Sequence, residues 1–187
     1  QILSSRSINN VPVPNLFMPP LYAWFLFSIK FLINDLNLFL NITFIIQILL
    51  SIISIFLMFL ICLNFFDKKV SLIGATIYAF FPLNIYAVSQ ISSITLQMFL
   101  INLFFLFFIR FYKESKNINI IIFSIASSLL ILLRGEFYIF VIFSLAFVLF
   151  KKKKLNKILL SSLLIIIMIS PYLYRNYNIF NVITITK

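Results

Sequence analysis

A long apolar run with charged and polar residues at its two ends limits what this chain can fold into. The run Ile158–Tyr174 holds about seventeen apolar or small residues, enough for a helix to cross the roughly 30 Å hydrocarbon core of a bilayer. Four consecutive lysines, Lys151–Lys154, lie just before it. Because short lysine-rich loops stay in the cytoplasm, the polar residues Tyr172–Tyr177 should lie at the far side of the membrane.

The composition is typical of a protein that crosses the membrane several times. Hydrophobic residues make up 63% of the 187 residues and charged residues 10%, whereas a soluble domain is about half apolar. The net charge of +11 arises from short basic clusters between apolar runs. We interpret these clusters as topology signals and expect no nucleic-acid binding. The lack of histidine and the single cysteine, Cys62, exclude zinc sites, disulfides and histidine acid–base chemistry within this chain.

We predict an all-α, polytopic transmembrane bundle with about six spans and one interfacial or re-entrant helix. The expected spans are 38–66, 70–88, 94–111, 118–133, 137–150 and 158–174. The further helix covers 18–33 and starts at Pro19 and Pro20, because a missing N–H costs nothing in a first turn. Residues 1–17 should be the end of an external loop. The start at Gln1, with neither methionine nor signal peptide, leads us to expect one membrane domain from a longer protein.

The basic loops agree on one orientation in the membrane. Asp67–Lys69, Arg110–Lys116 and Lys151–Lys157 hold most of the fifteen basic residues, and two predicted spans separate each loop from the next. All three therefore face the cytoplasm, and the remaining loops face outward. Residues 18–33 either span the membrane or lie in the outer interface. Their shortness, the Pro-Pro start and the position of Lys30 favour the interface.

Two polar clusters follow predicted spans on the outer side. Arg134 and Glu136 either form an ion pair that closes a turn, or Arg134 faces a phosphate, whose oxygens suit the planar guanidinium. Gln90 lies among serines at the end of the 70–88 run. Hydrogen bonds between helices would explain Gln90 as well as ligand binding does.

The third outer cluster is Arg175, Asn176 and Tyr177 at the end of the last predicted span. Arginine and tyrosine often anchor a helix at the interface, so an anchor and a binding site are both open interpretations. No pair of carboxylates accompanies the three clusters, and Asp35 is placed as a helix boundary. The clusters could bind an anionic, lipid-linked ligand, but they lack an obvious general base.

Several short motifs occur in a familiar order. They are Met18-Pro19-Pro20-Leu21-Tyr22, Asp67-Lys68-Lys69 before Gly74-Ala75, Phe81-Pro82 with Tyr86 and Ser93-Ile94-Thr95-Leu96, Leu132–Glu136, and Ser170–Phe180. Over nearly the whole chain they resemble the GT-C superfamily of glycosyltransferases that use polyprenyl-phosphate sugars. The nearest likeness is to bacterial relatives of dolichyl-phosphate-mannose protein mannosyltransferases and of the lipid A aminoarabinose transferase.

The resemblance implies an inverting transferase in the bacterial inner membrane, with several passes and a periplasmic active face. It would move a sugar from an undecaprenyl-phosphate carrier to a lipid, glycan or protein acceptor, in contact with membrane lipid. Arg134 and Arg175 would stabilise the leaving polyprenyl phosphate. The other residues expected to contact the substrate are Glu136, Asn176, Tyr177, Pro20, Tyr22 and Gln90.

The chain also departs from the family pattern. The family's catalytic aspartate lies in the first external loop, but 1–17 contains no acid, so we expect the catalytic acid upstream and none within this chain. Ile94 stands where relatives often carry glutamate, and Gly135 replaces the commoner proline. Many relatives use a divalent metal. Asp35 and Glu136 alone cannot form a metal site, so we predict no metal within these residues.

Three other functions remain open from the sequence. A flippase or transporter of lipid-linked sugars would carry charges near mid-membrane, and only Lys30 is a candidate here. A polymerase or ligase of the O-antigen type would carry its main external loop after these spans. An inactive structural paralogue would account for Ile94 and the missing acids.

Overall fold

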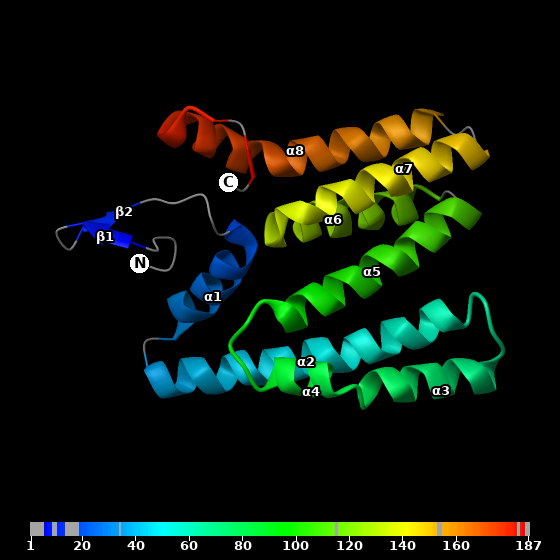
Figure 1. Ribbon diagram of the computed structural model, residues 1–187, viewed down its shortest axis with the longest axis horizontal. Helices are drawn as coiled ribbons and strands as arrows, with labels where there is room; N and C mark the ends of the chain where they lie inside the picture. The colour runs from blue at the N-terminus through cyan, green and yellow to red at the C-terminus, as the bar shows by residue number, and fades with distance from the viewer. Residues whose placement is uncertain are drawn as a thin grey trace.

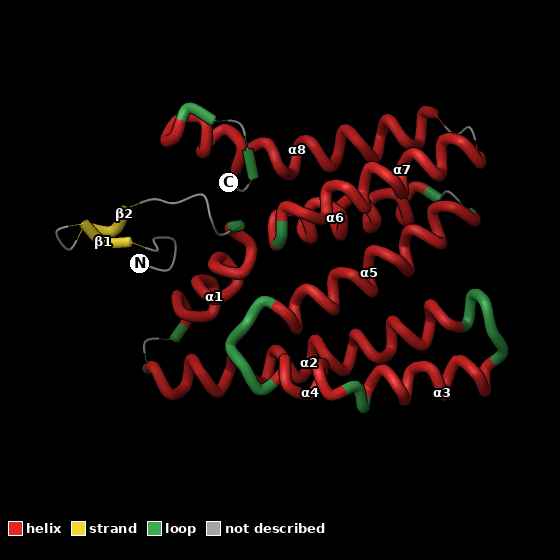
Figure 2. Tube along the Cα trace, in the orientation of Figure 1, coloured by secondary structure: helices red, strands yellow, loops and turns green. Residues whose placement is uncertain are grey.

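The structure, a computed structural model, describes residues 6–8, 11–13, 19–33, 35–114, 116–152, 155–182 and 184–185. Helices make up nearly all of these residues, and the strands within them form one short hairpin (Figure 2). The hairpin pairs β1 (Arg6–Ile8) with β2 (Val11–Val13) in antiparallel order. It lies where we expected a loop. The predicted all-α membrane class is confirmed.

Long helices run back and forth along the bundle (Figure 1). In chain order the helices are α1 (Pro20–Leu32), α2 (Leu36–Cys62), α3 (Lys68–Ala79), α4 (Pro82–Val88), α5 (Ile94–Lys113), α6 (Asn117–Leu133), the short 3-10 helix η1 (Gly135–Phe137), α7 (Tyr138–Lys152) and α8 (Leu155–Phe180). In Figure 1, α2, α5 and α7 run one way, and α3, α6 and α8 run the other. The connections therefore gather at two opposite ends.

One end of the bundle carries the basic loops, and we call it the basic end. Its described side chains are those of Lys68, Lys69, Arg110, Lys113, Lys116, Lys151 and Lys157. Lys113 Nζ donates to Asn64 Oδ1 at 3.0 Å, and Lys157 Nζ donates to Asn117 Oδ1. These bonds join the loops, as their shared orientation predicts. The opposite end, which we call the α1 end, holds α1, the start of α2, residues 89–93 and 134–137, and the end of α8 (Figure 1).

The expected six spans are not confirmed. Three helices, α2, α5 and α8, are long and apolar enough to cross a bilayer, and α3 with α4 makes a fourth if the bent pair counts as one span. α6 has 17 residues, the lower limit for a transmembrane helix, and α7 has 15, which is below it. The predicted 70–88 span is two helices bent by 53°. Pro82 starts the second helix because proline lacks the N–H that would continue the first.

Two helix starts follow directly from the sequence. Asp35 precedes α2, and its Oδ1 accepts a hydrogen bond from Leu38 N at 2.9 Å, which satisfies one of the free N–H groups at a helix start. This contact agrees with the interpretation of Asp35 as a helix boundary. α1 starts at Pro20 with Pro19 at its N-cap, so the predicted Pro-Pro start is also observed.

The last helix is longer than predicted. α8 contains Pro171 within it and continues beyond the expected end at Tyr174 to Phe180. Proline removes the N–H that would bond to the Ile167 carbonyl, but Ser170 Oγ donates to that carbonyl at 2.9 Å. Such side-chain compensation lets membrane helices contain proline. Arg175, Asn176 and Tyr177 therefore lie on the last turns of a helix and not in a following loop.

The core lies where α5 and α6 cross. Phe104, Phe111 and Phe123 are fully buried, and the Phe123 ring centroid lies 5.2 Å from that of Phe104 and 5.6 Å from that of Phe111. α6 also packs on α8, where Ser124 and Ser161 share a hydrogen bond of 2.8 Å. Small polar residues of this kind bring membrane helices close together. The core thus uses part of the abundant phenylalanine for packing.

Candidate functional site

α1 lies across one end of the bundle and connects several helices there. The Trp24 ring packs edge-on against Tyr172 of α8, with the centroids 6.4 Å apart. The Lys30 ammonium lies 5.6 Å from the centroid of the Phe39 ring in the first turns of α2. α1 also packs against α6. α1 therefore contacts α2, α6 and α8 at this end of the bundle.

Arg134 and Glu136 follow the end of α6 at the α1 end. Arg134 has an extended backbone, with φ −147° and ψ 114°, which ends the helix. Both side chains are exposed, and within the described residues neither forms an ion pair. The alternative of a closed Arg134–Glu136 pair is not what the structure shows. The Arg134 guanidinium is therefore open to an anion.

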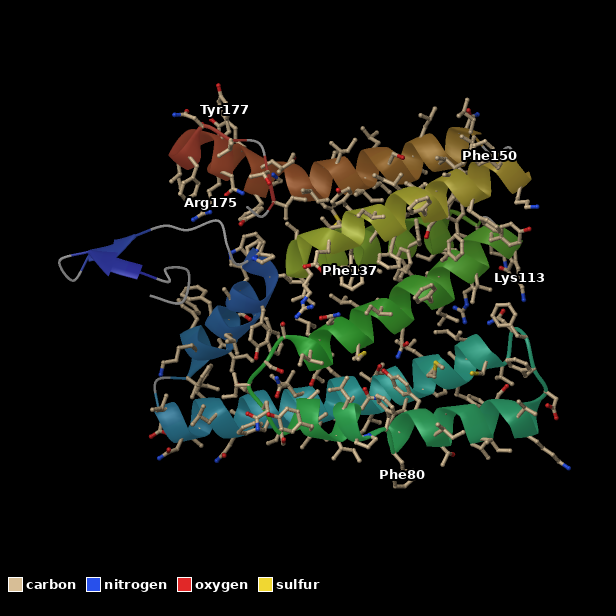
Figure 3. All side chains as sticks on the ribbon, viewed as in Figure 1. Phe80, Lys113, Phe137, Phe150, Arg175 and Tyr177 are labelled. Carbon is tan, nitrogen blue, oxygen red and sulfur yellow. The ribbon has the colours of Figure 1, made fainter. Side chains whose placement is uncertain are left out.

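Arg175 and Asn176 have defined partners on α8 and in the segment after it. Arg175 Nη1 donates to Asn176 Oδ1 at 3.0 Å, and its guanidinium lies 5.8 Å from the centroid of the Tyr172 ring. Asn176 is fully buried, and its Nδ2 donates to the Thr184 carbonyl at 2.7 Å. Asn176 therefore ties the following chain to α8. Tyr177 is exposed on the same helix end (Figure 3).

The chain turns back after α8, and this turn allows the hydrogen bond between Asn176 and the Thr184 carbonyl. Asn181 has a φ of 54°, the left-handed conformation that commonly ends a helix. Its N–H donates to the Tyr177 carbonyl at 2.8 Å. The chain then turns back so that the carbonyl of Thr184 meets Asn176. Figure 3 shows Arg175 and Tyr177 at the opposite end of the bundle from Lys113 and Phe150.

A further polar group, which we call the neutral cluster, consists of Tyr22, Gln47 and Ser92. Gln47 of α2 is 1% exposed, and its Nε2 donates to the Ser92 carbonyl at 3.2 Å. The Gln47 amide also neighbours the Tyr22 hydroxyl of α1. Tyr22 Oη, Gln47 Oε1 and Ser92 Oγ are buried, yet none has a well-aligned hydrogen-bond partner in the described part of the chain.

Burial raises the pKa of the Tyr22 hydroxyl to about 12, and the neighbouring Gln47 amide offsets only part of the rise. The hydroxyl therefore keeps its proton at physiological pH and can both donate and accept. Of the other predicted residues nearby, Pro20 is buried and Gln90 is exposed. Ser92, and not Gln90, provides the hydrogen-bonded contact between this loop and α2.

Sequence reasoning missed Gln47. Its partner Ser92 is 45 residues away, so no local pattern joins the two. The available signal was a glutamine in the middle of a mostly apolar run, because polar groups within membrane helices usually have a specific partner.

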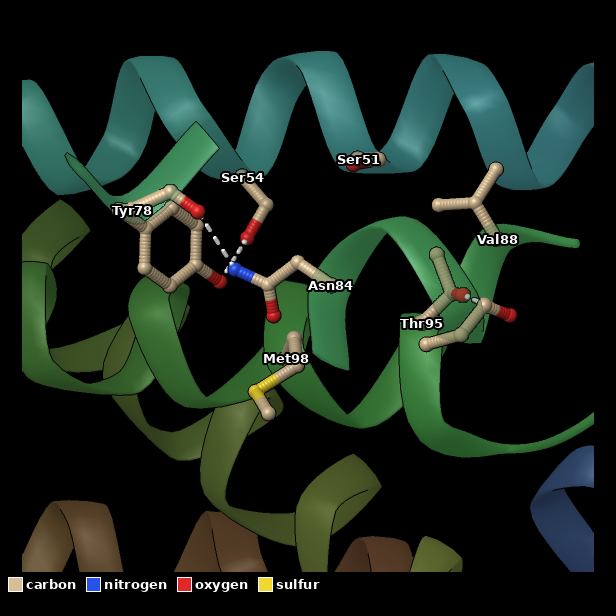
Figure 4. Close-up of a pocket in the computed structure, with 8 residues that line it drawn as sticks. Ser51, Ser54, Tyr78, Asn84, Val88, Thr95 and Met98 are labelled. Atoms are coloured by element: carbon tan, nitrogen blue, oxygen red, sulfur yellow. Dashed lines mark hydrogen bonds between the residues drawn. The ribbon is translucent and has the colours of Figure 1, made fainter. Parts of the chain in front are cut away.

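A second network lies inside the bundle, where α3 meets α4 (Figure 4). Asn102 Nδ2 donates to Ser54 Oγ at 2.7 Å and to Tyr78 Oη at 3.0 Å. Asn84 Nδ2 donates to the Tyr78 carbonyl at 2.8 Å, whereas Asn84 Oδ1 is buried and has no partner within the described ranges. A cavity of about 10 Å³ lies beside these groups, which is room for about one water molecule. The rest of its lining consists of Ser51, Ala87, Val88, Thr95 and Met98.

Metal ligands are sparse in this arrangement. Across the described ranges, no three side chains of histidine, cysteine, aspartate or glutamate lie close enough to hold a metal ion. These residues therefore do not fit the divalent metal that many relatives use, and no chemical step here is assigned to one.

The fold and the site together define a class of protein, a helical, multi-pass membrane protein with the exposed Arg134 and the half-buried Arg175 at the end of its bundle opposite the basic loops. A family model described as dolichyl-phosphate-mannose-protein mannosyltransferase matches residues 18–174. The chain belongs to this family of membrane glycosyltransferases. The resemblance to GT-C enzymes predicted from the motif order is thereby confirmed. Neither the curated proteins nor the solved structures contained a match to the chain.

Proposed function

We propose that this chain forms the donor-binding part of a glycosyltransferase that takes a sugar from a polyprenyl-phosphate carrier. The transfer would occur on the periplasmic side of a bacterial inner membrane, to a lipid, glycan or protein acceptor. One observation in particular supports a lipid-phosphate site. The exposed Arg134 has no ion-pair partner among the described residues, and it lies at the end of the bundle opposite the basic loops.

The reaction needs positive charge at the place where negative charge develops. The acceptor hydroxyl attacks the anomeric carbon, the bond from that carbon to the phosphate oxygen breaks, and the carrier phosphate leaves with the electron pair. Guanidinium groups suit this phosphate because they donate two parallel hydrogen bonds. Arg134 and Arg175 are the residues that we assign to this role. A carboxylate outside the described residues would accept the hydroxyl proton.

Arg175 is prepared for such a contact by its neighbours. Its guanidinium bonds to an amide oxygen and lies over an aromatic ring, without a carboxylate partner in the described part of the chain. Its positive charge is therefore not neutralised locally. The side chain is half-buried, and a partly buried charge attracts an anion more strongly than a fully hydrated charge does.

A transporter is less well supported by the same contacts. Lys30, the candidate for a mid-membrane charge, lies over Phe39 at the α1 end. The network of Ser54, Tyr78 and Asn102 within the bundle is neutral and hydrogen-bonded to itself. Such a network is typical of helix packing in membranes. A substrate path through the bundle would instead require ionisable groups there.

The test is binding of radiolabelled undecaprenyl phosphate to the full-length protein in nanodiscs. We expect Arg134→Ala and Arg175→Ala to weaken binding roughly tenfold each, the effect of losing one charge-assisted contact. Arg110→Ala is the matched control, because this arginine lies at the basic end and packs over Phe107 at 5.2 Å. Unchanged binding in both variants would refute the proposed site. Tight binding without any sugar transfer would identify an inactive paralogue.

A further inference from the structure

We propose that the neutral cluster of Tyr22, Gln47 and Ser92 is a subsite for the hydroxyl groups of the sugar that the carrier brings. This inference rests on the proposed function, because that function supplies a polyprenyl-phosphate-linked sugar at the α1 end. It adds a separate binding element for the sugar, distinct from the arginines assigned to the phosphate.

The first argument is the grouping of unsatisfied polar atoms. Roughly nine in ten buried polar groups in proteins have a hydrogen-bond partner. Tyr22 Oη, Gln47 Oε1 and Ser92 Oγ are buried without a well-aligned partner among the described residues. The three residues come from α1, α2 and the loop before α5, and they meet around one amide. Groups that remain unsatisfied together are best explained by a shared polar ligand.

The second argument is the chemistry of the three groups. A phenol and a serine hydroxyl each donate and accept, and an amide oxygen accepts. Sugar hydroxyls also donate and accept, so each of them can satisfy two of these groups at once. None of the three residues is charged, and a phosphate would be poorly stabilised there. The subsite thus fits the neutral part of the donor and not its anionic part.

The third argument is that the groups are already positioned. Gln47 Nε2 donates to the Ser92 carbonyl at 3.2 Å. Because this bond fixes the orientation of the amide, the Oε1 atom points to the other side. The Tyr22 ring is stacked on Phe25, with the centroids 6.0 Å apart and the planes at 24°. Preorganised groups bind with a smaller loss of side-chain entropy.

The experiment compares two ligands on the full-length protein in nanodiscs. One ligand is undecaprenyl phosphate alone. The other is the same carrier bearing a sugar, tested in turn with glucose, mannose, galactose and 4-aminoarabinose. The ratio of the two dissociation constants isolates the contribution of the sugar. In the wild type we expect at least one sugar to tighten binding. We expect Tyr22→Phe and Gln47→Leu each to reduce the gain in affinity that the sugar gives by about five- to tenfold. Tyr22→Phe removes a single oxygen atom.

Three controls separate this inference from other causes. Neither variant should change the affinity for sugar-free carrier by more than about twofold, since the phosphate contacts remain. Tyr112→Phe makes the same substitution near the basic end of α5 and should leave the gain intact. Arg134→Ala should weaken binding of both ligands equally. The melting temperature of Tyr22→Phe should not fall, because the change removes a buried hydroxyl without a well-aligned partner, whereas Gln47→Leu should lose some stability together with the bond to the Ser92 carbonyl.

The outcomes are distinct. An unchanged sugar gain in both variants means that ordered water alone fills the cluster, and it overturns the subsite. A wild type that binds every carrier equally also overturns the subsite, but leaves the lipid-phosphate site standing. A wild type that binds no carrier overturns the proposed function itself.

Discussion

The indole of Trp24 meets the phenol of Tyr172 edge-on, with ring centroids 6.4 Å apart. This contact joins α1 to α8, although the two residues are far apart in the sequence. Tyr172 also lies beneath the guanidinium of Arg175 at 5.8 Å. The position of α1 is therefore linked to an arginine of the proposed phosphate site, while α1 itself carries Tyr22 of the neutral cluster.

Removing the indole should loosen α1. An edge-to-face aromatic pair contributes about 0.5–1.5 kcal/mol, so Trp24→Ala should speed amide exchange in α1 by about two- to tenfold. The measurement is hydrogen–deuterium exchange with mass spectrometry on the protein in nanodiscs. Phe31→Ala is the control on the same helix, because Phe31 is 77% exposed. Equal exchange in both variants would show that this contact does not hold α1.

The hydrogen bond from Ser170 to the Ile167 carbonyl should matter only because of Pro171. Ser170→Ala removes the one replacement donor and should lower the free energy of unfolding by about 1 kcal/mol. With Pro171→Ala also present, the backbone N–H returns and the serine becomes dispensable. The measurement is a double-mutant cycle by unfolding in mixed micelles. An equal effect of Ser170→Ala in both backgrounds would contradict this explanation of the continuous α8.

The network around Asn102 should stabilise the bundle without a part in ligand binding. Asn102→Leu removes the contacts to Ser54 and Tyr78, which keep a hydrogen bond of 3.0 Å to each other. Hydrogen bonds between membrane helices contribute roughly 0.6 kcal/mol on average and up to about 1.7. We therefore expect a loss of about 1–2 kcal/mol in the same unfolding assay. Asn156→Leu, at an exposed position in the first turn of α8, should have almost no effect. A matching loss there would contradict the assignment.

The features that follow local rules could be predicted from the sequence. The start of α1 at the proline pair and the role of Asp35 as a helix boundary both depend on neighbouring residues. The shared end of the basic loops follows from their spacing. Arg134 could be singled out because a charge at the edge of an apolar run must be hydrated or bound.

The features that the sequence did not reveal depend on contacts that the fold makes between separate segments of the chain. Gln47 and Ser92 are 45 residues apart, and Ser54 and Asn102 are 48 apart, so only the fold brings these pairs together. The continuation of α8 from Tyr174 to Phe180 was missed because the polar residues Arg175, Asn176 and Tyr177 suggested the end of the span, whereas Asn176 bonds to the chain that follows. The prediction of six spans was not confirmed. An apolar run in the sequence shows how many hydrophobic residues follow one another, but how the helices pack decides where each helix bends or ends.

The α1 end, with Arg134 and Arg175, should face the periplasm while the basic end faces the cytoplasm. Cysteine labelling tests it directly, because Cys62 is the single cysteine and Cys62→Ser gives a clean background. Glu136→Cys and Glu114→Cys place a thiol at an exposed position at either end. A membrane-impermeant maleimide on intact spheroplasts should label Glu136→Cys at once and Glu114→Cys only after lysis. Labelling of Glu114→Cys in intact cells, with Glu136→Cys protected, would contradict the account.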